Sequence, residues 1–316
     1  VRGCLALGDK VLVADGANLV EFDTLTNSSK VLCTIAAAGV FVGDVLNETL
    51  YFCTANECLE YDGARVRSWG VPDVANQPAV VASATGGLLE GYYRVAMTYV
   101  DADGREGGTD IPLTLYVPAS GAIEVTVPTP PAGCTANVYI GPNSGDTVYL
   151  QSPKVSAGVL KYTSLRDDTA RCTTVFLKAP TPGHLVAVHN SSLAVAVGNV
   201  LNLTAPFRTH LVQRIRGFLQ FGAEVGMAVS TGDVLFVSAD KTYALTDVET
   251  DGITQRTVLE FPAIAGTSVL LPDGRGTWMT QYGQAVTDND NVSLVSKGAH
   301  VPDLSEKGAA GVIDTN

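Results

Sequence analysis

The segment GHLVAVHNSSLAVAVGNVLNL (residues 183–203) contains three short apolar runs separated by two tight polar turns. The same order of runs and turns returns in MAVSTGDVLFVSADKTYAL (residues 227–245) and in SVLLPDGRGTWMTQYGQAVT (residues 268–287). Turn residues at fixed offsets between β-branched runs predict antiparallel hairpins. A recurrence every forty or so residues, about one blade in length, is typical of a β-propeller with four-stranded blades.

Two more copies of the pattern precede this segment, in residues 4–35 and 39–69. The spacing from Asp44 in the second copy to Asn190 in the third exceeds one repeat by roughly 100 residues, which predicts an inserted domain. Prolines flank the insertion on both sides, at Pro72, Pro78, Pro180 and Pro182. We therefore expect the first part of a β-propeller in residues 1–71, an inserted β-sandwich in residues 72–180, and the second part of the propeller in residues 181–316.

The insertion has a strand pattern of its own. Alternating apolar runs occupy residues 92–100, 111–117, 123–127, 136–140, 147–150 and 159–163. Six or seven such strands in about 100 residues are typical of a Greek-key sandwich of the immunoglobulin type. In the first run, one face carries Tyr93, Val95, Met97 and Tyr99, and we expect this face in the core.

Residues 205–221 interrupt the β rhythm. The loose spacing of Leu211, Val212 and Ile215 leaves two interpretations open, a long loop between blades or a short helix on the rim. The segment also concentrates basic side chains, and we interpret these as a candidate contact with a protein partner in preference to DNA, with local salt bridges as the alternative: Arg208, His210, Arg214 and Arg216. Further along, residues 311–314 are predicted to pair with the first blade and close the ring.

Composition narrows the classes of function. The chain has 316 residues and is 46% hydrophobic, which suffices for a large core. Its net charge of −12 is spread along the sequence. That distribution disfavours sequence-specific nucleic-acid binding. The sequence predicts neither a membrane span nor a signal peptide, because it lacks a long uninterrupted apolar run and a charged segment ahead of an apolar one at its start.

Residues able to carry catalysis or bind a metal form no recognisable set. Four histidines are available as bases, but no Gly-x-Ser-x-Gly elbow is present to expose a nucleophile. The acidic segment Asp101–Glu106 places its glycine too early for a calcium loop, so we interpret it as a hairpin turn. We therefore expect a protein that is not an enzyme, without catalytic residues, metal or cofactor.

Six cysteines are irregularly spaced, which is not the pattern of a disulfide scaffold. We favour reduced, buried thiols. The best disulfide candidate is Cys53 with Cys58, since the two can face each other across a hairpin with the loop Thr54–Glu57. A zinc site would need a second pair of ligands nearby, and the sequence offers none.

Three stretches resemble a known family. GYYRVAMTYVDADGREG (residues 91–107), followed by NVYIG (137–141) and YL (149–150), resembles the fibronectin-III-like modules embedded in bacteriophage tail proteins. PTPGHLVAVHNSSLAVAVGNVL (180–201) and VLFVSADKTYAL (234–245) are similar to the blades that follow such a module. A departure lies near Pro206, where the aromatic-rich proline segment that such proteins often carry is reduced to Ala-Pro-Phe.

The resemblance implies a non-enzymatic virion structural protein in the tail, assembled in the bacterial cytoplasm. A nozzle, hub or tube-associated ring component would contact other tail proteins, form a homo-oligomeric ring and touch exiting DNA only passively. The main alternative is a β-propeller that binds glycans or a receptor during host adsorption. That alternative would use aromatic platforms, for which Trp69 and Trp278 are the available tryptophans.

Overall fold

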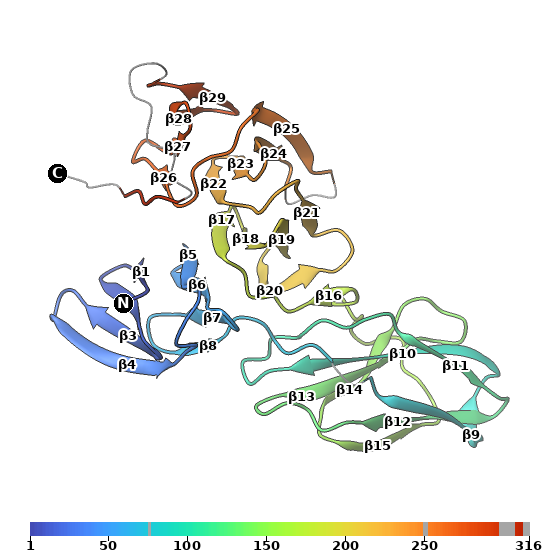
Figure 1. Ribbon diagram of the computed structural model, residues 1–316. Helices are drawn as coiled ribbons and strands as arrows, with labels where there is room; N and C mark the ends of the chain where they lie inside the picture. Colours follow the sequence, from blue (N-terminus) through green and yellow to red (C-terminus); the bar gives the residue numbers. More distant parts are fainter. Residues whose placement is uncertain (75–76, 249–251, 297–306, 312–316) are drawn as a thin grey trace. The chain divides into compact units, whose positions relative to one another are not determined.

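The computed structural model describes residues 1–74, 77–248, 252–296 and 307–311. In these ranges all regular secondary structure is β-strand, which confirms the predicted all-β class (Figure 1). No helix in the described ranges is long and apolar enough to cross a membrane. The chain separates into two compact units: unit 1 comprises Val1–Trp69, Pro180–Thr209 and Arg216–Asn316, and unit 2 comprises Gly70–Ala179 and His210–Ile215.

Within the described residues, unit 1 contains five antiparallel blades, each with its strands in chain order. Blade 1 contains β1 (Gly3–Leu7), β2 (Lys10–Asp15), β3 (Asn18–Asp23) and β4 (Ser28–Thr34). Blade 2 contains β5 (Val42–Leu46), β6 (Thr49–Cys53), β7 (Cys58–Tyr61) and β8 (Val66–Ser68). Blade 3 contains β17 (Leu185–His189), β18 (Ser192–Val197), β19 (Val200–Ala205) and β21 (Phe218–Gln220).

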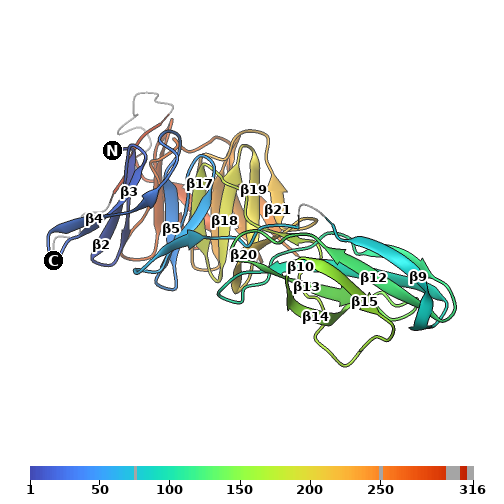
Figure 2. The ribbon, with the colours of Figure 1, turned by 90° about the horizontal axis from the view of Figure 1, so that it is seen from below.

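Blade 4 contains β22 (Met227–Thr231), β23 (Val234–Ser238), β24 (Thr242–Thr246) and β25 (Thr254–Leu259). Blade 5 contains β26 (Val269–Leu270), β27 (Gly276–Thr280), β28 (Gly283–Asp288) and β29 (Asn291–Leu294). The first strands of consecutive blades are neighbours, from β1 to β5, β17, β22 and β26. Figure 2 shows the blades side by side. This arrangement is propeller-like, as the sequence repeats predicted.

Two-residue turns set the register of the blades. In blade 3, Val197 pairs with Val200 and Gly198 has a φ of 59°. In blade 4, Thr231 pairs with Val234 and Gly232 has a φ of 57°. The right-handed twist of paired strands favours turns with positive φ, and glycine adopts that conformation without a steric penalty.

Apolar side chains fill the spaces between blades. Leu12 and Leu19 of blade 1 pack with Phe52 and Tyr61 of blade 2. The fully buried Trp69 packs with Leu193 of blade 3. Between blades 4 and 5, the rings of Phe236 and Trp278 lie 5.9 Å apart. Both tryptophans therefore belong to the core of unit 1, and neither offers the exposed platform that glycan binding would use.

The interpretation of residues 205–221 as a loop or a short helix was wrong. The segment forms β20 (Arg208–Gln213), which pairs with β16 (Leu177–Lys178) in unit 2, and β21, which pairs with β19 in unit 1. Leu211 and Val212 are both buried, although consecutive strand residues point to opposite faces. A strand covered on both faces loses the alternation of apolar and polar residues, so its sequence imitates a helical turn.

Unit 2 is a β-sandwich of seven strands in two sheets. One sheet has the order β11 (Leu113–Val117), β10 (Gly91–Val100), β13 (Thr135–Ile140) and β14 (Tyr149–Val155). The other has the order β15 (Gly158–Tyr162), β12 (Gly121–Val127) and β9 (Ala79–Leu88). The face expected in the core is confirmed, because Tyr93, Val95, Met97 and Tyr99 are all buried between the sheets.

The compact units differ from the predicted parts at one point. Residues 210–215 belong to unit 2, whereas the sequence predicts them in the second part of the propeller. The other boundaries, after Trp69 and before Pro180, lie within two residues of the predicted ones. The predicted pairing of residues 311–314 with blade 1 lies outside the described residues, except for Gly311.

Candidate functional site

The first strands of blades 2 to 5 surround a hollow of about 450 Å³. Most of its wall is aliphatic and comes from β5, β17, β22 and the start of blade 5. Three side chains contribute polar groups, Asp44, Ser230 and Ser268. A hollow at the axis of a propeller-like array is a common position for a ligand site, so these groups are the first candidates for function.

Asp44 joins blade 2 to blade 3. Its Oδ2 accepts a hydrogen bond of 2.7 Å from the Val188 N–H, and its Oδ1 accepts one of 2.8 Å from the Val45 N–H. Burial raises the pKa of Asp44, although both N–H groups act in the opposite direction. Val188 lies on β17, the first strand of blade 3, which pairs with β18 on one side. The Val188 N–H points to the other side, towards the axis, and therefore needs a side-chain acceptor.

His189 joins blade 3 to blade 4 in the same way. The imidazole is buried, and its Nδ1 lies 2.9 Å from the Ser230 hydroxyl on β22. Its Nε2 lies 3.5 Å from the Asn190 side-chain amide. The geometry is that of a hydrogen bond between blades.

Blades 1 and 2 share a polar cluster in which Glu21 and Tyr61 are buried, Lys10 is partly exposed and Lys30 is exposed. The Tyr61 hydroxyl donates to the Glu21 carboxylate, and Lys30 Nζ lies 3.1 Å from the same group. Burial acts to raise the pKa of Glu21, but the bonds from Tyr61 and Lys30 and the charge of Lys10 outweigh it and lower the pKa. The cluster is internally satisfied and has no group directed at a ligand.

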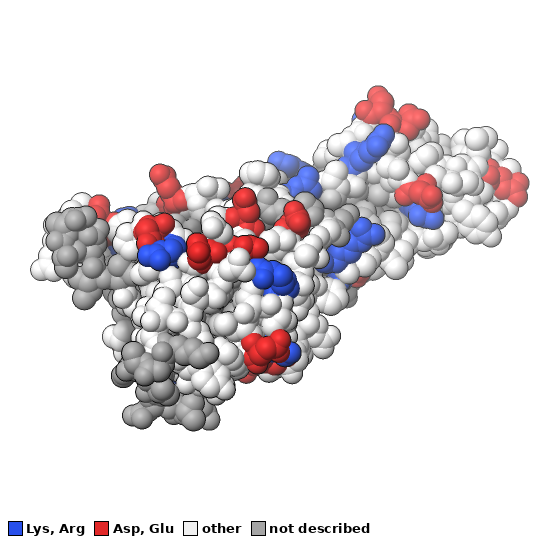
Figure 3. All heavy atoms as spheres, turned by 90° about the horizontal axis from the view of Figure 1, so that it is seen from above, with Lys and Arg blue, Asp and Glu red and all other residues white. Residues whose placement is uncertain are grey.

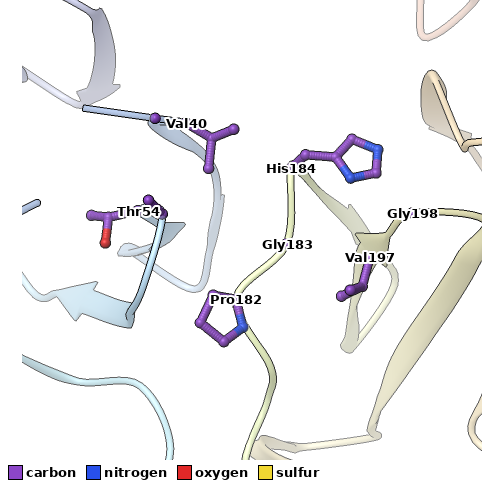
Figure 4. A pocket seen from close by; sticks show the side chains of 9 residues that line it. Val40, Thr54, Pro182, Gly183, His184, Val197 and Gly198 are labelled. Carbon is purple, nitrogen blue, oxygen red and sulfur yellow. The ribbon is translucent and has the colours of Figure 1, made fainter.

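A second hollow, of about 340 Å³, lies between blades 2 and 3 (Figure 4). Its wall is formed by turn residues of blade 2 and by the start of blade 3, with His184 as its one ionisable side chain. His184 Nε2 donates a hydrogen bond of 2.7 Å to the Val225 carbonyl and lies 3.5 Å from Glu224. His184 therefore connects blade 3 to the segment that leads into blade 4.

The four basic candidates fall into two groups. Arg208 and Arg216 are exposed in unit 1, whereas His210 and Arg214 belong to unit 2. His210 Nε2 donates a hydrogen bond of 3.2 Å to the Glu106 carbonyl. The structure therefore does not gather the four side chains into one basic surface within a unit.

Arg214 holds together the two segments that connect the sandwich to the rest of the chain. Its guanidinium lies 2.7 Å from Asp110 and 3.3 Å from Asp73, and its Nε donates to the Leu177 carbonyl. Asp73 also accepts a hydrogen bond of 2.9 Å from the Ala179 N–H. Asp73 lies on the segment that enters the sandwich, and Ala179 lies on the segment that leaves it. Arg214 therefore forms local salt bridges, which the sequence analysis gave as the alternative to a partner contact.

Charges of both signs are interspersed on the surface. On the face drawn in Figure 3, arginine and lysine side chains lie beside aspartate and glutamate side chains. Ion pairs such as Arg94 with Asp146, at 2.7 Å, and Arg256 with Asp290, at 3.0 Å, bring opposite charges together. A phosphate-backbone site would instead gather basic groups in a patch or stripe.

No group of three or more His, Cys, Asp or Glu side chains in the described ranges could hold a metal ion. Asp101, at the start of the segment first compared with a calcium loop, accepts bonds from the N–H groups of Asp103 and Arg105 and pairs with the Arg105 side chain at 2.8 Å. These bonds are those of a closed hairpin turn.

Comparisons with known proteins show neither a family nor a function for this chain. No family model matches the chain, and no curated protein matches it. Among solved structures, the BBS1N complex with ARL6DN matches with a TM-score of 0.33 and 11% identity, covering 95% of this chain and 80% of that chain. The N-terminal domain of Nup159 matches with a TM-score of 0.31 and 11% identity, covering 99% and 65%.

The extracellular domain of a hybrid two-component system from B. thetaiotaomicron matches with a TM-score of 0.35 and 11% identity, covering 93% of this chain and 32% of that chain. Identities this low carry no information about binding or activity.

The contacts of Asp44 and His189 were missed by sequence reasoning. The sequence offered one signal for these contacts, a polar residue at an unusual place in a repeat. Asp44 lies within the first strand of its repeat, and His189 follows directly after the first apolar run of the next.

Proposed function

We propose that this chain is a non-enzymatic structural protein of a bacteriophage tail, a nozzle, hub or tube-associated ring component that assembles with other tail proteins. The proposal takes its biological setting from the resemblance of residues 91–107, 180–201 and 234–245 to tail proteins. One structural observation supports an assembly role above all others. It is the outward face of blade 1, the face opposite the one that packs on blade 2.

That face is mostly apolar. The register of β1 to β4 aligns Cys4 with Val13, Ala6 with Val11, and Val20 with Val31. The aligned residues are partly or fully exposed, and Val31 is 61% exposed. The apolar members of the face are Cys4, Ala6, Val11, Val13, Val20, Phe22 and Val31, and its polar members include Ser29, opposite Phe22, and the pair of Asp15 with Asn18.

A soluble protein rarely leaves a continuous apolar sheet face open to water, and such faces usually mark contacts between proteins. A face of this kind on blade 1 is suited to receiving another sheet, either from a second copy in a ring or from a neighbouring tail protein. The polar groups at the axis support the same role, because Asp44 and His189 are used in hydrogen bonds between blades.

Unit 2 fits the second component of the proposal, a fibronectin-III-like module. In immunoglobulin-type sandwiches, strands B and E pair in one sheet, while C, F and G pair in the other. Here β9 pairs with β12, and β10, β13 and β14 are neighbours, which corresponds to B with E and C with F and G in chain order. The strand β11 beside β10 takes the position of C′, and β15 adds an edge strand beside β12.

The assembly proposal is tested with Val31→Asp, and Val81→Asp serves as the matched control. Val81 is 59% exposed on β9 of unit 2, so the two substitutions place the same charge at equally exposed strand positions. We expect concentration-dependent association of the parent chain in sedimentation velocity. The association should be lost in Val31→Asp and kept in Val81→Asp. Equal behaviour of all three proteins would refute a role of the blade 1 face.

Its place in the particle is tested separately, by immunogold electron microscopy with an antibody raised against the purified chain. We expect label on the tails of phage particles that carry this chain. Label confined to capsids, or absent from purified particles, would refute the tail assignment even if the blade 1 face mediates association.

Glycan binding is the second candidate function, and one observation favours a site on the sandwich over a site on the propeller. Tyr92 and Tyr116 are opposite each other on β10 and β11, both exposed, with ring centroids 5.3 Å apart. Glu90 accepts a hydrogen bond from the Tyr116 hydroxyl. Exposed aromatic rings beside a carboxylate are suited to sugar recognition, since rings cover the apolar face of a sugar while the carboxylate accepts from its hydroxyls. Binding on a glycan array that disappears in Tyr92→Ala would favour this candidate.

A further inference from the structure

Two cysteines face each other across the hairpin that joins β6 to β7. Cys53 pairs with Cys58 in the register, and their sulfur atoms lie 3.4 Å apart. The Thr54 N–H donates a hydrogen bond of 2.9 Å to the Glu57 carbonyl, so Thr54 and Glu57 form a hydrogen-bonded pair and the cysteines form the next, non-hydrogen-bonded pair. The Cα atoms of such a pair are about 4.5 Å apart, within the range that a disulfide spans.

The surroundings distinguish the two sulfurs. The hydrogen bond from the Cys58 thiol lowers the pKa of Cys53, against the opposing effect of burial, and the Gly183 N–H contributes in the same direction as Cys58. The bond to Cys53 and burial raise the pKa of Cys58. Cys53 is therefore suited to attack as a thiolate, and Cys58 to follow as the second thiol.

A hollow lies next to this buried pair. The hollow between blades 2 and 3 has Thr54 and Gly183 in its wall (Figure 4). Thr54 follows Cys53 in the chain, and the Gly183 N–H is bonded to the Cys53 sulfur. The hollow, of about 340 Å³, therefore reaches the immediate neighbours of the attacking sulfur.

We propose that Cys53 and Cys58 are a thiol–disulfide exchange site, which forms a reversible cross-strand disulfide with a low-molecular-weight disulfide as oxidant. Cys53, as the thiolate, attacks one sulfur of the oxidant and releases the other as a thiol. Cys58 then loses its proton to solvent and attacks the Cys53 sulfur of the mixed disulfide, which releases the second thiol. Two protein thiols are oxidised, and one oxidant disulfide is reduced to two thiols.

The other cysteines lack this arrangement. The register places Cys4 opposite Val13 and Cys33 opposite Leu19, and Cys134 and Cys172 lie in unit 2. The disulfide would join β6 to β7 inside the core shared by blades 2 and 3, next to Trp69 and Leu193. Oxidation would therefore fix the hairpin at an interface between blades.

The test uses the full chain in buffers with a series of ratios of reduced to oxidised glutathione. Samples are quenched with acid, alkylated and digested with trypsin and a glutamate-specific protease without reduction. Cleavage after Glu57 separates the two cysteines, so a peptide pair joined by a disulfide identifies the 53–58 bond by mass. Cys134→Ala serves as a control variant that leaves the hairpin unchanged.

We expect the 53–58 disulfide to form at glutathione ratios about tenfold more reducing than those that attach glutathione to Cys134. In Cys58→Ala, we expect glutathione to remain on Cys53 as a mixed disulfide, because the resolving thiol is absent. Persistence of both thiols in their alkylated form at ratios that modify Cys134 would overturn the proposal. A bond from Cys53 to Cys33 in the parent chain would overturn it as well.

Discussion

Substitution of Asp44 by alanine is expected to loosen blade 2 from blade 3 while leaving both blades folded. The Asp44 side chain accepts a hydrogen bond of 2.7 Å from Val188, on the first strand of the next blade. The shorter methyl side chain of alanine would leave that N–H without its acceptor. An unsatisfied buried donor costs about 1–3 kcal/mol, and relief from burying a carboxylate offsets part of this cost. We expect a net loss of about 1–2 kcal/mol in the free energy of unfolding of unit 1.

Tryptophan fluorescence during urea unfolding measures this loss selectively. Both tryptophans, Trp69 and Trp278, lie in unit 1 and are buried, so their emission reports on the blades and not on the sandwich. Asp233→Ala is the matched control, because it removes an exposed carboxylate from the turn between β22 and β23. We expect its unfolding free energy to stay within about 0.5 kcal/mol of the parent value.

The pH dependence of the same measurement carries a definite sign. The folded pKa of Asp44 is raised above the unfolded value of about 3.9, so its stabilising contribution is complete below that pH and declines as pH rises through the folded pKa. The stability difference between the parent and Asp44→Ala should therefore be largest below the unfolded pKa and shrink as pH rises through the folded pKa. The difference between Asp44→Asn and Asp44→Ala should stay constant. A parent-to-alanine difference of zero at every pH would refute the assigned role of Asp44.

Three further predictions address the sandwich and the cluster between blades 1 and 2. Arg214→Met should destabilise unit 2 by about 1 kcal/mol, a value reduced for the partial exposure of Asp73 and Asp110. It should also speed proteolysis near Asp73 and Ala179, whereas Arg208→Ala should not. Met97→Ala should destabilise unit 2 by about 2–5 kcal/mol, measured by near-ultraviolet tyrosine signals, without moving the tryptophan transition of unit 1. Glu21, with its lowered pKa, should stabilise the chain above pH of about 4.3 and lose this contribution as pH falls through its folded pKa, so the gap between the parent and Glu21→Gln should close in acid. A tryptophan transition that shifts with Met97→Ala, or a Glu21→Gln gap that widens in acid, would contradict the respective assignment.

The parts of the fold that the sequence predicts are those in which local chemistry and tertiary packing agree. Gly198 and Gly232 lie in two-residue turns where positive φ is required, so the hairpins of blades 3 and 4 are visible in the pattern. The core face of β10 is visible too, because its alternate residues Tyr93, Val95, Met97 and Tyr99 are large and apolar, whereas the other face carries Arg94, Ala96 and Thr98.

The parts that were missed lack that alternation. Leu211 and Val212 of β20 are both buried, and this pair resembles a helical turn in sequence. The strand β9 (Ala79–Leu88) consists mostly of small and weakly apolar residues, so no apolar run identifies it. The hydrogen bonds of Asp44 to Val188 and of His189 to Ser230 join strands that are far apart in sequence, so no pattern within a single repeat indicates them.

Blade 1 has apolar residues on both of its faces. An inner blade of a propeller-like array is covered on both faces, and its strands are therefore apolar on both faces. In blade 1, Leu12 and Leu19 face blade 2, while Val13 and Val20 face the other way, so the strands β2 and β3 have the composition of an inner blade. Blade 2 covers only the first of these faces. Val11, Val13, Val20 and Phe22 are partly exposed, so a further sheet packed on them would give blade 1 the cover of an inner blade.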